Sequence, residues 1–138
     1  AGLHPDNLTV EFTKTAIMEA GQVAEDNLRA LRSVGIRVAF DDFGTGFSSI
    51  NRLRSNAFDV LKIDRNFVAN VADRSDDRAL VTAIVALANV FDVKVVAEGI
   101  ETEAQLDAVT ELGCHAAQGR LFAMAAPIDE VAGPLDFV

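Results

Sequence analysis

The sequence predicts an α/β protein built from repeated strand–helix units around a parallel sheet. Short runs rich in β-branched residues alternate with longer segments in which apolar residues recur at helical spacing. The short runs are almost continuously apolar, as expected for strands that are covered on both faces. Polar residues follow these runs at intervals of about 20 to 36 residues, which suits a barrel with roughly 30 residues per unit.

The individual elements follow from these patterns. Five segments are expected to be strands: Leu8–Phe12, Arg37–Phe40, Val60–Ile63, Lys94–Ala97 and His115–Gln118. Three segments between them are expected to be helices: Val23–Val34, Asp76–Phe91 and Glu103–Leu112. Gly35 and Gly113 stand where helices should stop, and Thr102 with Gln105 forms a capping box at the last helix. A closed barrel needs eight strands, so the five strands predict part of a barrel whose N-terminal strands are missing.

Composition excludes several classes of protein. Half of the 138 residues are hydrophobic, which is typical of a globular domain rather than a disordered one. The formal net charge of −9 disfavours binding to a DNA or RNA polymer, suits carboxylate sites for divalent cations, and is also typical of ordinary solubility. The single cysteine, Cys114, excludes an intrachain disulfide and indicates packing rather than a nucleophile. The longest apolar run, Ala79–Phe91, is too short to span a bilayer.

Acidic and other polar side chains stand at the carboxyl ends of all five predicted strands. Glu11, the pair Asp41 and Asp42, and Glu98 each follow an apolar residue at such an end. The remaining polar positions are Lys62 with Asp64 in the third unit and Gln118 in the fifth. In parallel α/β proteins this edge of the sheet is where functional sites form, so the sequence predicts a site here.

The segment Asp41–Ser49 reads as a strand end, a tight glycine-containing loop and a helix N-cap at Ser48 or Ser49. Together with Lys62-Ile63-Asp64, Glu98-Gly99-Ile100-Glu101-Thr102 and Ala117-Gln118-Gly119, it resembles the EAL phosphodiesterase family. The resemblance runs from about Leu3 to Pro127, with the motifs in the family's order. It identifies residues 1–138 as the C-terminal portion of a single EAL domain, which is a TIM-like (β/α)8 barrel.

The resemblance implies hydrolysis of cyclic di-GMP to the linear dinucleotide pGpG with Mg²⁺ or Mn²⁺. It implies direct metal ligands at Glu11, Asp41 and Glu98, with Asp42 joining them at a second metal. By the same resemblance, Lys62 would orient or deprotonate the attacking water, and Asp64 would support the metal-bound waters. Glu101 would hold the loop that carries the adjacent acids, and Gln118 would contact the water cluster or the substrate.

Elementary chemistry agrees with this assignment. A phosphodiester is an anion, and attack by hydroxide adds negative charge to its oxygens. Two cations roughly 4 Å apart stabilise the entering and leaving oxygens and lower the pKa of bound water. A lysine beside such cations is expected to have a lowered pKa and to act as a base near neutrality.

The chain departs from the family pattern at several places. Lys14 stands where the family usually has a second glutamate, and Phe47 stands where tyrosine is usual. The segment Leu121–Pro127 keeps only its proline and lacks the usual basic residue. The signature glutamate and an asparagine ligand belong to an earlier part of the family domain, so the isolated fragment is expected to be inactive.

Two alternatives remain beside the phosphodiesterase. One is a degenerate EAL domain that binds cyclic di-GMP or a protein without turnover, which Lys14 favours. The other is a metal-dependent barrel of different chemistry, such as an enolase-like lyase, which the motif set disfavours. The expected partners and setting are cyclic di-GMP, self-association through the open barrel edge or an EAL dimer, an upstream sensory or GGDEF-type domain in the parent protein, and the cytoplasm.

Overall fold

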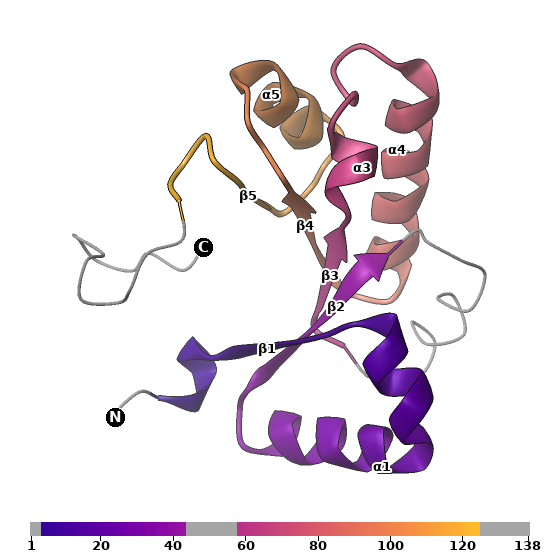
Figure 1. Ribbon diagram of the computed structural model, residues 1–138, viewed down its shortest axis with the longest axis vertical. Coiled ribbons are helices and arrows are strands. Elements are labelled where there is room, and N and C mark those ends of the chain that lie inside the picture. The colour runs from indigo at the N-terminus through magenta and orange to yellow at the C-terminus, as the bar shows by residue number, and fades with distance from the viewer. Residues whose placement is uncertain (1–3, 44–57, 125–138) are drawn as a thin grey trace.

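The computed structural model describes residues 4–43 and 58–124, which form a five-stranded sheet with the strand order β1-β2-β3-β4-β5. Its strands are β1 (Thr9–Phe12), β2 (Arg37–Phe43), β3 (Val60–Ile63), β4 (Lys94–Glu98) and β5 (Ala116–Gln118). All four neighbouring pairs are parallel, which confirms the predicted sheet. Because the strand order follows the chain order, each described connection leads from one strand to its neighbour (Figure 1).

The described helices differ from the predicted ones mainly near the N-terminus. They are a 3₁₀ turn, η1 (Pro5–Asn7), and the α-helices α1 (Lys14–Ser33), α3 (Arg65–Val68), α4 (Ser75–Val90) and α5 (Glu103–Glu111). The predicted start of α1 at Val23 was wrong, because the helix begins at Lys14 and changes direction at Gly21. Gly21 has φ 52° and ψ −130°, a conformation that glycine adopts without the clash of a Cβ atom. The single turn α3 was not predicted.

The predicted helix ends are confirmed. Thr102 Oγ1 accepts a hydrogen bond from the backbone N–H of Gln105 at 3.2 Å, and the Gln105 side chain returns one to the Thr102 N–H at 3.1 Å. Gly35 and Gly113 follow α1 and α5 with φ of +93° and +87°. Ser48 and Ser49, the expected N-cap of another helix, lie outside the described residues.

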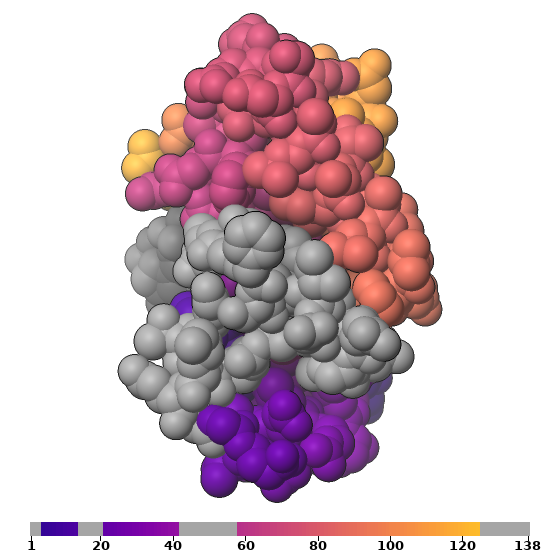
Figure 2. Space-filling view, turned by 90° about the vertical axis from the view of Figure 1, so that its right-hand side faces the viewer, coloured from indigo at the N-terminus to yellow at the C-terminus, as the bar shows by residue number. Residues whose placement is uncertain are grey.

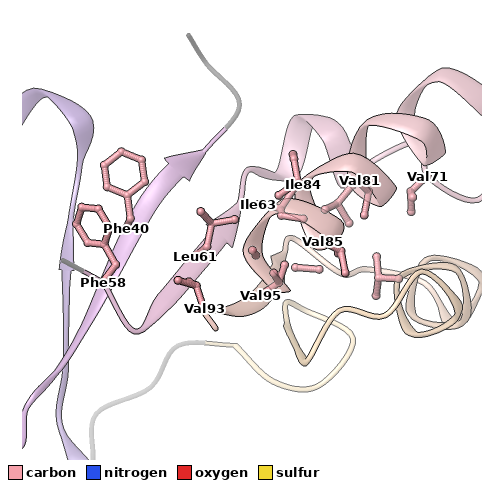
Figure 3. Close-up of a cluster of buried hydrophobic side chains, with 14 of the residues drawn as sticks. Phe40, Phe58, Leu61, Ile63, Val71, Val81, Ile84, Val85, Val93 and Val95 are labelled. Atoms are coloured by element: carbon pink, nitrogen blue, oxygen red, sulfur yellow. The ribbon is translucent and has the colours of Figure 1, made fainter. Parts of the chain in front are cut away.

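The core lies between one face of the sheet and the helices. Leu61 and Ile63 of β3 and Val95 of β4 are fully buried. Figure 3 shows these side chains on the side where α4 supplies Val81, Ile84 and Val85. Nearer β2, the rings of Phe40 and Phe58 pack with centroids 4.9 Å apart. In Figure 2, which faces the helices, α3 and α4 form one packed surface.

Alternate strand residues point away from this core, so the strands are less uniformly buried than their apolar sequences predict. Along β4, buried residues alternate with more accessible ones. Along β1, exposed residues alternate with half-buried ones. Lys62 lies on this second face and is only 4% exposed. It is the one buried charged or polar residue of the described part of the chain. None of the described helices is both long and apolar enough to cross a membrane.

Cys114 packs against the core, as predicted, and burial raises the pKa of its thiol from 9.0 to about 11. Near pH 8 the folded protein then holds about a hundredfold less thiolate than the unfolded chain. We expect iodoacetamide to alkylate Cys114 about a hundredfold more slowly in buffer than in concentrated urea at the same pH. Equal rates in the two solvents, followed by mass spectrometry, would contradict the burial of this thiol.

Candidate active site

Four of the predicted site residues meet at the carboxyl ends of the strands. The Nζ atom of Lys62 lies 2.7 Å from Glu11 Oε2 and 2.5 Å from Glu98 Oε1. Gln118 lies beside Glu98 in the register of β4 and β5, and its Nε2 donates to Glu98 Oε1 at 2.7 Å. One ammonium group therefore joins the ends of β1, β3 and β4, and an amide extends the cluster to β5.

The cluster opens onto a groove of about 350 Å³ along the face of the sheet opposite the described helices. Glu11, Lys62 and Gln118 line one part of it, and the remaining lining combines polar side chains such as Arg37 with small or aliphatic ones such as Val96. The charged groups differ in exposure, since the side chain of Glu11 is 48% exposed and that of Glu98 only 18%. Solvent thus reaches the site from the side of β1.

The two carboxylates of the cluster determine the direction in which the pKa of Lys62 shifts. Burial opposes the charged form of this amine, but hydrogen bonds and charge attraction from Glu11 and Glu98 outweigh it and raise the pKa of Lys62. The lowered pKa predicted for a lysine beside bound cations concerns the metal-loaded site and stays a prediction. Burial raises the pKa of Glu98, the charges of Asp41 and Glu11 add to this rise, and Lys62 opposes it.

The adjacent acids Asp41 and Asp42 coincide with an irregularity in the sheet that the sequence did not predict. Phe40 pairs in register with Leu61, yet the next register pair is Phe43 with Ile63. Two consecutive residues of β2 therefore stand against the single β3 residue Lys62, which is the arrangement of a β-bulge. In a regular strand neighbouring residues point to opposite faces, and a bulge relaxes that alternation beside the site.

The other predicted residues have structural contacts. Asp64 Oδ1 accepts a hydrogen bond from the backbone N–H of Asn66 at 2.8 Å and so caps α3. Glu101 is exposed and lies 3.8 Å from Arg120. The loop that Glu101 was predicted to hold falls outside the described residues. So do the side chains of Asp42 and Lys14, although Lys14 is the first residue of α1.

The donor chemistry of the site fits a divalent cation. Glu11 and Glu98 already bind a cationic group, and the charge of Asp41 reaches Glu98. Hard divalent cations prefer such oxygen ligands. Across residues 4–43 and 58–124, however, no three His, Cys, Asp or Glu side chains are arranged to hold a metal ion. Glu11, Asp41 and Glu98 therefore have the ligand type that suits such a cation, and in this arrangement they do not form a group of three that could hold it.

Three close contacts around the site were missed by sequence reasoning. The amide of Gln105 donates to the carbonyl of Ala69 at 3.0 Å. A Cβ atom on Gly99 would lie 2.6 Å from Arg65 Cβ, and one on Gly119 would overlap the backbone of Ile100. The capping box predicted the role of the Gln105 oxygen but not the partner of its nitrogen, and Gly99 and Gly119 entered the sequence analysis only as members of motifs.

Comparison with known proteins gives consistent matches. The family model described as EAL domain matches residues 1–125. The bifunctional diguanylate cyclase/cyclic di-GMP phosphodiesterase MucR of Pseudomonas aeruginosa is 41% identical over 129 residues, which cover 94% of this chain and 19% of MucR. The chain spans between 16% and 32% of the length of the curated relatives that it matches.

Solved structures agree with the sequence matches. The MucR phosphodiesterase in complex with c-di-GMP superposes with a TM-score of 0.79 at 41% identity, covering 92% of this chain and 51% of that one. BlrP1 of Klebsiella pneumoniae, solved with manganese and c-di-GMP, gives a TM-score of 0.78 at 32% identity, covering 87% of this chain and 31% of that one.

Proposed function

The chain belongs to the EAL domain family, and from that membership we propose that the protein carrying it hydrolyses cyclic di-GMP to pGpG. The observation that carries the proposal is the buried ammonium group of Lys62, held between Glu11 and Glu98 at the carboxyl edge of a parallel sheet. Burying a charged amine is costly unless it is paired. A structural role alone would be served by an apolar residue at position 62, as at its register partner Val96.

The proposed cofactor is Mg²⁺ or Mn²⁺, held by the carboxylates of Glu11, Asp41, Asp42 and Glu98. A divalent cation bound there neutralises charge on the phosphoryl oxygens and lowers the pKa of a coordinated water. The relative solved with manganese and c-di-GMP, BlrP1, supports a divalent ion at such a site.

Other side chains of the proposed site would then position the water that attacks the phosphodiester. Lys62 would orient the attacking water through its ammonium, which lies at the centre of the cluster. It would deprotonate that water only as the neutral amine, which Glu11 and Glu98 disfavour in this arrangement. The side-chain amide of Gln118 donates a hydrogen bond to Glu98 and so holds this carboxylate in place. Gln118 would also contact the attacking water or the substrate. Asp64 would support the waters around the cations, and Glu101 would hold the loop that carries the adjacent acids.

The test is hydrolysis of cyclic di-GMP by the complete natural protein that carries this sequence, followed by chromatography of pGpG. We expect turnover with Mg²⁺ or Mn²⁺, its loss in excess EDTA, and its recovery when the ion is restored in excess of the chelator. Binding of cyclic di-GMP without pGpG under either ion would contradict the proposal. A Lys14→Glu variant assayed in parallel separates the alternative, because turnover only in that variant would identify a degenerate, binding-only site.

A further inference from the structure

The side chain of Gln105 forms hydrogen bonds in two directions. Its Oε1 accepts from the backbone N–H groups of Glu101 and Thr102, at 2.8 and 3.1 Å. Its Nε2 donates to the carbonyl oxygen of Ala69 at 3.0 Å, across 36 residues of sequence. The amide therefore connects the segment that follows β4 with the end of α3.

The second of these contacts is not needed for the capping box. A capping box forms equally with glutamate or glutamine at this position, because only a side-chain oxygen is required. The nitrogen of Gln105 serves a different purpose, since the last carbonyls of a helix lack partners within the helix. Ala69 is the C-cap residue of α3, and Gln105 supplies a donor to its carbonyl.

The two segments that Gln105 joins carry the residues of the site. α3 begins directly after Asp64, two residues beyond Lys62, and the segment Gly99–Thr102 begins directly after Glu98. The same two segments touch at Gly99, where a Cβ atom would lie 2.6 Å from Arg65 Cβ. Gly99 has φ +73°, which favours glycine. Contacts at both ends of α3 thus hold it against the segment that leaves β4.

We infer that Gln105 is a positioning residue, which ties α3 to the segment after β4 and so fixes Lys62 relative to Glu98. This inference rests on the proposed function, because the positioning serves the proposed hydrolysis. Gln105 does not reach the reacting atoms and acts only through the backbone of these two segments. Its amide nitrogen, rather than its oxygen, carries the effect.

Substitution by glutamate separates the two halves of the side chain. Gln105→Glu keeps the acceptor for Glu101 and Thr102 and removes the donor to Ala69. Ala104→Glu is the matched control, because it adds the same charge at the neighbouring exposed position of α5. Both variants are assayed in the complete natural protein for turnover of cyclic di-GMP and for backbone amide exchange by NMR.

Gln105→Glu is expected to lower kcat about tenfold with KM nearly unchanged, since small errors in the position of catalytic groups are costly. Amide exchange at Phe67 and Ala69 of α3 should quicken about tenfold, while Leu106 of α5 keeps its protection. Ala104→Glu should leave both measurements as in the unsubstituted protein. A purely structural role in α5 would instead change melting and Leu106 exchange and leave kcat alone.

Two results would overturn the inference. One is unchanged exchange at Phe67 and Ala69 in Gln105→Glu, which would show that the amide does not hold α3. The other is faster exchange there with kcat unchanged, which would show that the link has no role in positioning. If the unsubstituted protein fails to turn over cyclic di-GMP, the proposed function fails, and the exchange of Phe67 and Ala69 still decides whether Gln105 holds α3.

Discussion

Lys62→Met is expected to reduce hydrolysis of cyclic di-GMP by about 10³-fold, within the range lost when a group that moves or orients a proton is removed. Methionine has nearly the length of lysine, so it fills the buried position without an ammonium group. Glu11 and Glu98 then face each other without the cation that lies 2.7 and 2.5 Å from them. Steady-state kinetics with saturating Mg²⁺ or Mn²⁺ measure this loss.

The same substitution should lower the free energy of unfolding by about 1–2 kcal/mol, because Glu98 loses a charged hydrogen-bond donor. The loss is expected to be small because the side chain of Glu11 is 48% exposed, so water screens its attraction to the Lys62 ammonium. Lys94→Met is the matched control, since Lys94 is an exposed lysine on the neighbouring strand β4. It should change neither kinetics nor urea unfolding by more than about 0.5 kcal/mol. Equal activity of the two variants would remove Lys62 from the mechanism.

Gly119→Ala is expected to destabilise the fold by about 3 kcal/mol, at the upper end of the cost of overpacking. A Cβ atom at this position would overlap the backbone nitrogen and carbonyl oxygen of Ile100 and would lie 2.7 Å from its carbonyl carbon. Ile100 cannot move aside easily. Its N–H donates to the carbonyl of Gln118, its own carbonyl accepts from Leu121, and its side chain is fully buried.

Gly113→Ala is the control for this effect, because its φ of +87° also favours glycine but the nearest atom to an added Cβ lies 3.5 Å away. It should cost only about 1 kcal/mol, which is the penalty of the left-handed conformation alone. Urea unfolding of both variants gives the comparison. Equal losses at the two positions would show that the contact with Ile100 is relieved by a small shift of the chain.

The sequence predicted the sheet well because short apolar runs rich in β-branched residues mark the strands locally. β3 was predicted with its observed bounds, and β4 extends the predicted strand by one residue, to Glu98. The meeting of Glu11, Lys62 and Glu98 was likewise predictable, because parallel strands bring their carboxyl ends to one edge. The family resemblance supplied the order of the motifs, and the EAL domain match confirms it.

What the sequence did not predict depends on contacts between distant segments. The link from Gln105 to Ala69 spans 36 residues, and no local pattern marks the nitrogen of a glutamine for such a partner. The direction of the pKa shift of Lys62 depends on carboxylates of two other strands. The first part of α1 was missed because Gly21 interrupts the helical pattern while the chain resumes a helix in a new direction.

Because of the bulge in β2, deleting Asp42 would affect the sheet differently from substituting it. Substituting Asp42 keeps two residues against Lys62, whereas deleting it would bring Phe43 into regular register with Ile63 and leave one acid against Lys62. The deletion would thus repair the ladder of hydrogen bonds that the bulge interrupts. Loss of a single codon would therefore yield a domain with a more regular sheet and an incomplete set of acids. Under the proposed function, stability and catalysis would place opposite demands on this one position of the chain.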